Sequence, residues 1–278
     1  MPGGRASGSR GMGSWHRRQV VRHLVARVLP NIAVRALGRM QSSRTAIVLG
    51  ASGSVGTGLV KQLIANRLWN VVTLVRRSQP EQVAMARDAG IEFHEVLLPE
   101  MGREQLENAT AQAAGSQTGV VAAFSVLGIG AGTAKLSIDE HRAIDVHLNA
   151  AFARGLMKSK KVHHLAFMSA VGANPTAATS GSGAAGMARY SRVKGEAEEA
   201  VKASGLPVVS IFRPSMIIGS QHTPWLLERL LPIFSFITPG KFKSITVEQI
   251  AKAMIATSLN PPSASAVYHY PEMKALGS

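Results

Sequence analysis

Hydrophobic positions between residues 45 and 212 follow two patterns that alternate along the chain. Short apolar runs rich in β-branched residues, typical of buried strands, alternate with stretches whose apolar residues recur at helical spacing. The predicted strands are Thr45–Leu49, Asn70–Val75, Ile91–Val96, Val120–Phe124, His163–Met168 and Pro207–Phe212. The predicted helices are Val55–Asn66, Glu81–Ala89, Gln105–Ala113, Ile138–Lys158 and Ala188–Ala203. This alternation predicts an α/β fold with a doubly wound, mainly parallel sheet and helices on both faces.

The alternation stops after Phe212, and the residues that follow are too few for a second large domain. We therefore predict one domain over 45–278, in which 212–278 form a small cap on the substrate side of the sheet. The segment 225–237, WLLERLLPIFSFI, is strongly apolar. A buried cap helix is favoured over a membrane anchor, and a pocket for an apolar substrate or an oligomer face are further alternatives. A protein partner is also possible for the chain as a whole. The insert 173–186, rich in small residues, is predicted to be a loop.

Composition narrows the class of protein. The chain has 278 residues, 46% of them hydrophobic, which is enough for a sizeable core. It has no cysteine, which excludes disulfides, thiolate–metal sites and cysteine nucleophiles. No apolar run approaches the ~18 residues that a membrane-spanning helix needs.

The net charge of +15 is unevenly distributed along the chain. Residues 1–44 contain nine arginines and no acidic residue, whereas the rest holds 22 basic and 16 acidic residues. Because most of the excess charge lies in this leader, the case for a nucleic-acid-binding body is weak, and we expect no nucleic-acid partner.

The leader has the composition of a targeting segment. Its residues 15–30, WHRRQVVRHLVARVLP, place Val21, Leu24, Val25 and Val28 at helical spacing among arginines. An arginine-rich, acid-free amphipathic segment is typical of a mitochondrial transit peptide. The alternatives are a basic tail, a start at Met40 with a cytoplasmic protein, or a helix in peripheral contact with a membrane surface.

Three glycines follow the first predicted strand in the segment LGASGSVG, residues 49–56. Gly50 permits a tight turn, Gly53 lets a pyrophosphate approach the backbone, and Gly56 allows close packing of the helix that follows. This context predicts a dinucleotide-binding turn at the positive end of a helix dipole. The expected contacts are Gly50, Ser52, Gly53, Ser54, Val55 and Gly56. A glycine-rich loop without a ligand is the alternative.

The end of the second strand bears on the choice of cofactor. An NAD site usually has an acidic residue there, bonded to the ribose hydroxyls. Here the strand is followed by Arg76 and Arg77, with no acid before Glu81. Guanidinium groups suit a 2′-phosphate, so NADP(H) is favoured over NAD(H). The alternative is a solvated pair of arginines.

Tyr190 and Lys194 share one face of a predicted helix, because they are four residues apart. An ammonium beside a phenol favours the phenolate and lowers the phenol's pKa. Such a pair can act as general acid and base in the interconversion of a carbonyl and an alcohol. A surface pair without function is the alternative.

Taken in order, TAIVLGASGSVG, LAFMSAVGA, YSRVKGEAE and IFRPSMIIG resemble the short-chain dehydrogenase/reductase superfamily, over about residues 45–275. The glycine spacing and the FRPS segment point to its extended or atypical branch, and are most similar to the Tat-interacting-protein oxidoreductases and their fungal mitochondrial relatives. The resemblance implies a Rossmann fold that binds NAD(P).

The resemblance also implies roles for individual residues. Tyr190 would be the acid/base, Lys194 would assist it and hold the nicotinamide ribose, and Ser169 would bond to the reacting oxygen. Further cofactor contacts would be Leu127, Gly128, Pro214 and Ile217. Two positions depart from the family: Ala170 replaces a frequent second serine, and Asp145 stands where many members have an asparagine that supports a proton relay.

The histidines do not favour a metal site. His163 and His164 are adjacent on a predicted strand and therefore point to opposite faces. We predict no metal. The first hypothesis is an NADP(H)-dependent oxidoreductase acting on a small carbonyl or alcohol, and the alternative is a non-catalytic NAD(P)-binding scaffold or a regulatory or assembly subunit.

Overall fold

The computed structural model describes residues 44–130, 136–179, 185–218 and 240–278. The leader, the 225–237 segment and residues 180–184 of the predicted loop lie outside these ranges. Within the described part of the chain, no helix has the length and apolar character needed to cross a membrane.

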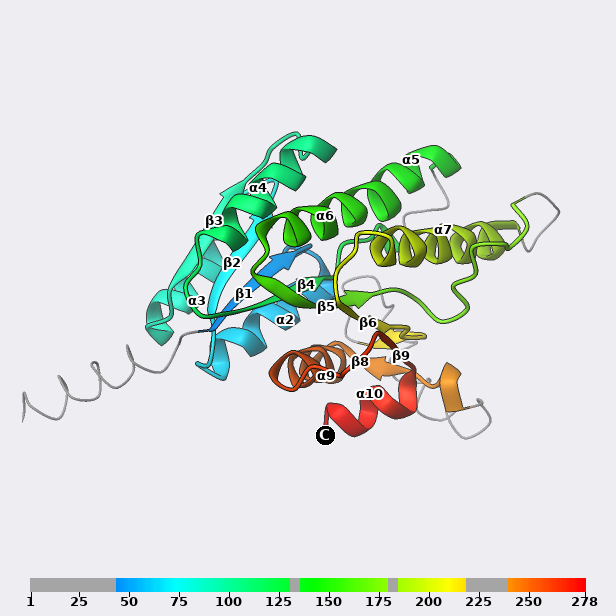
Figure 1. Ribbon diagram of the computed structural model, residues 1–278. Helices are drawn as coiled ribbons and strands as arrows, with labels where there is room; N and C mark the ends of the chain where they lie inside the picture. The colour runs from blue at the N-terminus through cyan, green and yellow to red at the C-terminus, as the bar shows by residue number, and fades with distance from the viewer. Residues whose placement is uncertain (1–43, 131–135, 180–184, 219–239) are drawn as a thin grey trace, which may run out of the picture. The chain divides into compact units, whose positions relative to one another are not determined.

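The core of the fold is a seven-stranded parallel sheet with the order β3-β2-β1-β4-β5-β6-β9 (Figure 1). Its strands are β1 (Arg44–Leu49), β2 (Asn70–Val75), β3 (Phe93–Leu97), β4 (Val120–Ser125), β5 (Val162–Met168), β6 (Val208–Phe212) and β9 (Ala266–Tyr268). The predicted α/β class and its parallel sheet are confirmed. The central strands are apolar almost throughout because helices cover both of their faces.

Two layers of helices cover the sheet. One consists of α4 (Arg103–Gly115), α5 (Ile138–Arg142), the π-helical turn η2 (Ala143–Leu148), α6 (Asn149–Ser159) and α7 (Ala185–Lys202). The other consists of α2 (Ser54–Ala65), α3 (Pro80–Ala89), α9 (Val247–Leu259) and α10 (Tyr270–Leu276). Figure 1 shows α4 and α6 above the sheet and α2 and α9 below it.

The C-terminal region differs from the prediction of a cap. β9 pairs with β6, and α9 buries Ile250, Ala251 and Met254 in the core beside α2, so these elements belong to the main fold. A separate two-stranded sheet, β7 (Ile217–Ile218) with β8 (Ile245–Thr246), and a 3₁₀ turn, η3 (Gly240–Phe242), make up the other described elements there. The hydrophobic pattern misses β9 because three residues at a sheet edge carry little periodicity.

The strand order places the functional edge of the sheet. From β1 the chain proceeds through β2 to β3 at one edge of the sheet, and from β4 it proceeds through β5 and β6 toward the other edge. The order in which strands are added therefore reverses between β1 and β4. Ligands of open α/β sheets bind at such a switch point, outside the carboxyl ends of the strands. The turn after β1 and the loop after β4 meet there.

Candidate functional site

The glycine-rich turn lies between the end of β1 and the start of α2. Gly50 has φ +88°, and a Cβ on it would lie 2.6 Å from the backbone nitrogen of Leu127. A Cβ on Gly56 would lie 2.0 Å from the carbonyl oxygen of Gly50. Both positions therefore exclude a side chain. Gly53, by contrast, is exposed, and a Cβ on it would make only an ordinary contact, 3.6 Å from the carbonyl oxygen of Gly50, so its backbone is accessible to a ligand.

A buried glutamine holds this turn in place. Gln82 of α3 donates from Nε2 to the carbonyl oxygen of Ala51 at 2.9 Å. The hydroxyl of Thr57 also donates to that oxygen, at 3.4 Å. Gln82 lies 31 residues from Ala51 along the chain, so the sequence pattern does not reveal this contact.

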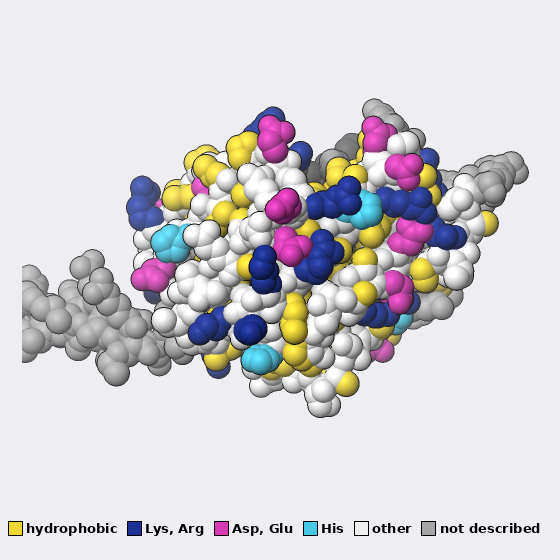
Figure 2. Space-filling view, turned by 45° about the horizontal axis from the view of Figure 1, so that its top comes forward, with side chains coloured by type: hydrophobic (Ala, Val, Ile, Leu, Met, Phe, Trp, Pro, Cys, Tyr) yellow, Lys and Arg dark blue, Asp and Glu magenta, His cyan; other side chains and the backbone are white. Residues whose placement is uncertain are grey.

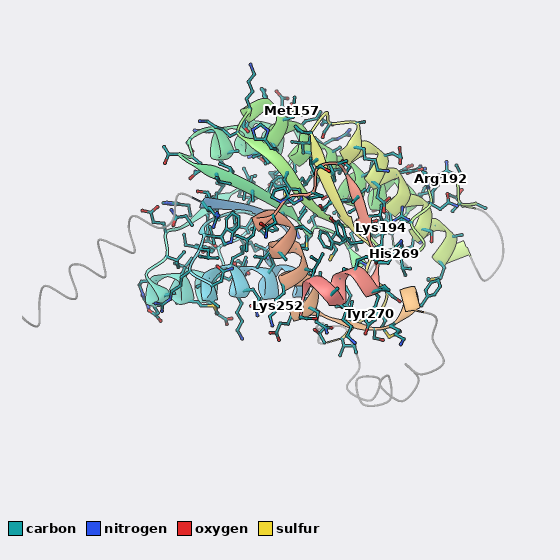
Figure 3. All side chains as sticks on the ribbon, turned by 60° about the horizontal axis from the view of Figure 1, so that its bottom comes forward. Met157, Arg192, Lys194, Lys252, His269 and Tyr270 are labelled. Carbon is teal, nitrogen blue, oxygen red and sulfur yellow. The ribbon has the colours of Figure 1, made fainter. Side chains whose placement is uncertain are left out.

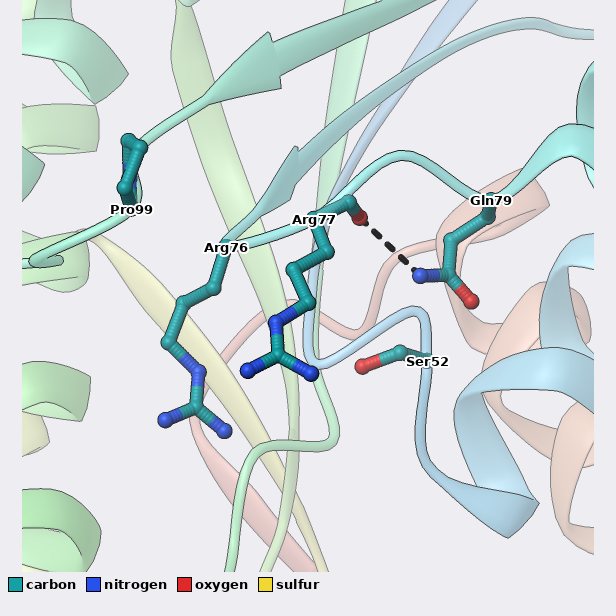
Figure 4. Close-up of a pocket in the computed structure, with 5 residues that line it drawn as sticks. All are labelled: Ser52, Arg76, Arg77, Gln79 and Pro99. Atoms are coloured by element: carbon teal, nitrogen blue, oxygen red, sulfur yellow. Dashed lines mark hydrogen bonds between the residues drawn. The ribbon is translucent and has the colours of Figure 1, made fainter.

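A cavity of about 500 Å³ lies beside the turn, lined by Ser52, Arg76, Arg77, Gln79 and Pro99 (Figure 4). The two arginines follow β2, and their guanidinium groups extend to the same side as Ser52. Gln79 donates from Nε2 to the carbonyl oxygen of Arg77 at 3.0 Å, which orders the backbone between them.

The nearby carboxylate on β3 is already engaged. Glu95 accepts hydrogen bonds from the Ser78 hydroxyl at 2.5 Å and from the backbone N–H of Gln79 at 2.7 Å. Glu95 does not line the cavity, whose lining residues are all basic or neutral, which suits an anionic group such as a phosphate.

The loop after β4 joins the glycine-rich turn to a second cluster. Leu127 contacts Gly50, and Gly128 contacts Lys194 and Asp145. A Cβ on Gly128 would lie 2.8 Å from Lys194 Nζ. The loop thus connects the two parts of the site that the sequence predicts separately.

Tyr190 and Lys194 both lie on α7. Lys194 Nζ is 5.7 Å from the centroid of the Tyr190 ring. The lysine faces the sheet and is buried, whereas Arg192, two residues earlier, lies on the outer side of the helix (Figure 3). The predicted pair therefore exists as a spatial pair with an inward-facing ammonium.

Lys194 forms an ion pair with Asp145 of η2, with 2.6 Å between Nζ and Oδ1. Burial alone would lower the pKa of Lys194, but the charges of Tyr190 and Asp145 and the hydrogen bond to Asp145 outweigh it and raise that pKa. Burial likewise tends to raise the pKa of Asp145, and Lys194 together with His141 lowers it to about 2. Both groups are therefore charged at neutral pH.

A buried histidine completes this cluster. The ring of His141 stacks on that of Tyr190, with centroids 5.9 Å apart and an interplanar angle of 23°. Its Nε2 lies 3.6 Å from Asp145 Oδ1. In the described part of the chain, neither ring nitrogen has a hydrogen-bond partner.

Asn149, at the start of α6, anchors the π-helical turn. Its Nδ2 donates to the carbonyl oxygen of Asp145 at 2.7 Å, and its Oδ1 accepts a hydrogen bond from the hydroxyl of Ser125 on β4. The predicted single helix over Ile138–Lys158 is thus interrupted at η2. His141, Asp145 and Asn149 recur every four residues and so share one face of the helix, and that polar series is the signal that could have revealed the cluster.

Ser169 occupies a different environment from the one its implied role requires. Its hydroxyl donates to Glu198 Oε1 at 2.5 Å, and Glu198 in turn accepts two hydrogen bonds from the Arg213 guanidinium. Glu198 lies one turn beyond Lys194 on α7. The structure therefore brings Tyr190, Lys194 and Gly128 together, while the Ser169 hydroxyl is bonded to Glu198, which is paired with Arg213.

Pro214 and Ile217 follow β6 at the same edge of the sheet. The carbonyl oxygen of Pro214 accepts a hydrogen bond from Val171 at 2.8 Å, which joins the segments after β5 and β6. Ile217 pairs with Ile245 in the small sheet.

The charged and histidine residues elsewhere show local pairing. On the face in Figure 2, basic and acidic side chains are interspersed. Arg142 and Arg192, for example, share Glu196. His163 is exposed and His164 buried, and the described ranges contain no group of three or more histidine, aspartate or glutamate side chains placed to hold a metal.

Three comparisons bear on this site. A family model described as NAD(P)H-binding matches residues 50–261. The mitochondrial protein FMP52 of Chaetomium globosum is 26% identical over 181 residues, which cover 64% of this chain and 68% of that protein.

The solved structures support the fold. A short-chain dehydrogenase/reductase from Serratia marcescens aligns with a TM-score of 0.58 at 15% identity, covering 82% of this chain and 97% of its own. BdcA, solved in complex with NADPH, aligns with a TM-score of 0.55 at 14% identity, covering 81% and 93%. Since the family model spans most of the chain and the glycine-rich turn has the geometry described above, this protein belongs to the NAD(P)H-binding family of Rossmann-fold proteins.

Proposed function

We propose that this protein is an NADP(H)-dependent oxidoreductase of the atypical short-chain dehydrogenase/reductase class. The observation that carries the cofactor choice is the cavity in which Arg76 and Arg77 face Ser52 of the glycine-rich turn. Two guanidinium groups and no lining carboxylate favour a 2′-phosphate over free ribose hydroxyls. The NADPH bound to the structural neighbour BdcA is consistent with this choice.

The chain's own residues supply the acid–base chemistry. When bound, the nicotinamide would exchange a hydride with the carbonyl carbon of a substrate. Tyr190 would deliver or accept the proton at its hydroxyl. The buried ammonium of Lys194 lies 5.7 Å from the centroid of the phenol ring and places a positive charge beside it. Stabilisation of the reacting oxygen by Ser169 requires its hydroxyl to leave Glu198.

That last requirement supports a second candidate, a cofactor-binding scaffold or assembly subunit without turnover. Ser169 is engaged by Glu198, and the residue beside it is Ala170, which has no hydroxyl. A protein that binds NADP(H) but does not reduce carbonyls would keep the glycine-rich turn and the arginines. The bond from Ser169 to Glu198 would not impair its function, because it needs no hydroxyl at the reacting oxygen.

Substituting Tyr190 separates the two candidates. We expect Tyr190→Phe to retain NADPH affinity in a calorimetric titration but to lower NADPH oxidation against a panel of ketones and aldehydes by at least ~100-fold. Tyr270→Phe, a matched change on α10, should leave both unchanged. Turnover that persists in Tyr190→Phe contradicts the assigned acid/base, and a cofactor-bound wild type without any turnover supports the scaffold.

The cellular location proposed here is mitochondrial. It rests on the arginine-rich, acid-free leader and on the mitochondrial name of the Chaetomium relative. Fusion of residues 1–44 to a fluorescent protein tests it, and a diffuse cytoplasmic signal contradicts it.

A further inference from the structure

Lys194 is unusual because its charge is fully enclosed by protein. Lys194 as a whole is 3% exposed, and its Nζ lies 2.6 Å from Asp145 Oδ1. The other carboxylate oxygen of Asp145, Oδ2, accepts a hydrogen bond from the backbone N–H of Ile129 at 3.1 Å. The carboxylate of Asp145 is therefore held by Lys194 at one oxygen and by the backbone of Ile129 at the other.

The surrounding backbone leaves space for this pair. A Cβ on Gly128 would lie 2.8 Å from Lys194 Nζ and 3.1 Å from Asp145 Oδ1. The π-helical turn, held by Asn149 through the Asp145 carbonyl, sets the position from which the carboxylate reaches the lysine. Asp145 is thus built into the site by three separate elements.

A buried ion pair is weak evidence for a stabilising role, since apolar residues of similar size often serve stability as well. Its chemical effect here is more specific. Burial favours the neutral amine, and a neutral amine neither places a positive charge beside Tyr190 nor binds ribose hydroxyls as a charged donor. A fixed carboxylate prevents that loss of charge.

We propose that Asp145 is a positioning residue that holds Lys194 charged and oriented beside Tyr190 at the end of the cofactor site. His141 serves the same arrangement, because it lies between Asp145 and the Tyr190 ring on which it stacks. The charged and titratable groups that face Lys194 are Tyr190 and Glu198 on its own helix, with Asp145 from η2. This inference rests on the proposed function where it invokes the cofactor.

The test uses Asp145→Asn in the full chain and measures NADPH affinity from pH 6 to pH 9.5. We expect a variant-to-wild-type ratio of Kd within about threefold at pH 6, rising at least ~10-fold by pH 9.5 as Lys194 loses its proton. The ratio cancels the titration of the cofactor's own phosphate. Asp139→Asn, an exposed carboxylate on α5, is the matched control and should show a flat ratio near one. A flat ratio for Asp145→Asn overturns the proposal.

A second measurement needs no cofactor. Thermal unfolding of Asp145→Asn, Lys194→Met and the double variant forms a cycle. We expect the double variant to melt higher than Asp145→Asn alone, because it leaves no unpaired buried charge. If Asp145→Asn fails to fold and the double variant folds, the pairing is supported, and additive losses overturn it. A wild type that binds no NADPH contradicts the proposed function, while this cycle still tests the pair.

Discussion

His164 and its neighbour His163 show how one residue position along a strand decides burial. His164 is buried in β5, 2.9 Å from the hydroxyl of Ser210, and burial lowers its pKa to about 4. His163, the next residue along the strand, points the other way and is exposed. The two form a natural pair for measuring the cost of burying an imidazole.

We expect the free energy of unfolding to decrease as the pH is lowered from about 6.5 to about 4. The unfolded chain binds a proton at His164 throughout this window, whereas the folded chain does not until pH 4, so acid favours unfolding. In denaturant titrations, the free energy of unfolding of His164→Gln should depend less steeply on pH than that of the wild type, by up to ~1.4 kcal/mol per pH unit. His163→Gln should keep the wild-type slope, and an equal slope in both variants contradicts the prediction.

At this scale, residues whose role depends on local sequence could be predicted and those with distant partners could not. The position of Gly50 follows from its strand–turn–helix context, and that of Arg76 from the end of a strand. The bond from Ser169 to Glu198 joins residues 29 apart, on a strand and a helix, and no local pattern contains it. Asp145 is visible in sequence as a departure from the family, but its pairing with Lys194 is not.

Among the elements, the π-helical turn η2 has the clearest consequence for the site. An apolar periodicity predicts one helix over 138–158, because a single widened turn shifts the pattern too little to be seen. Asn149 supports this turn from within, with Ser125 on the adjacent strand. The element that carries Asp145 therefore depends on a side chain of the next helix.

Asn149→Ala should destabilise the fold by about 1–3 kcal/mol, because it leaves buried polar groups without partners. Thermal unfolding followed by circular dichroism measures this loss. Asn108→Ala, at an exposed asparagine of α4 that bonds to Lys158, should change stability by no more than ~0.5 kcal/mol. Equal losses in the two variants would mean that the buried network contributes nothing specific.

On the scale of the whole molecule, the C-terminal residues complete the Rossmann fold. β9 extends the sheet beyond β6, Tyr268 stacks on Phe212, and Met273 of α10 is fully buried. The sequence alternation predicts six of the seven strands of the main sheet and the helices between them, but not α9 and α10. It does not predict the seventh, whose stability comes from packing against distant parts of the chain.

Met273→Ala should therefore cost about 2–5 kcal/mol, as for other large-to-small changes in a core. Met157→Ala is the matched control, since Met157 is 42% exposed on α6, and it should change the unfolding free energy by less than ~0.5 kcal/mol. If both variants unfold at the same denaturant concentration, α10 is not part of the cooperative core.

The most direct test of the whole account is a calorimetric comparison of NADPH and NADH binding to the full chain and to an Arg76→Ala/Arg77→Ala variant. We expect the wild type to bind NADPH at least ~10-fold more tightly than NADH, and the double variant to lose that preference while its NADH affinity stays within about threefold. Arg87→Ala, at an exposed arginine of α3, serves as the control and should keep the wild-type ratio. Equal affinities in the wild type, or a preference for NADPH that survives in the double variant, would contradict the assignment of this cavity to the 2′-phosphate of NADP(H).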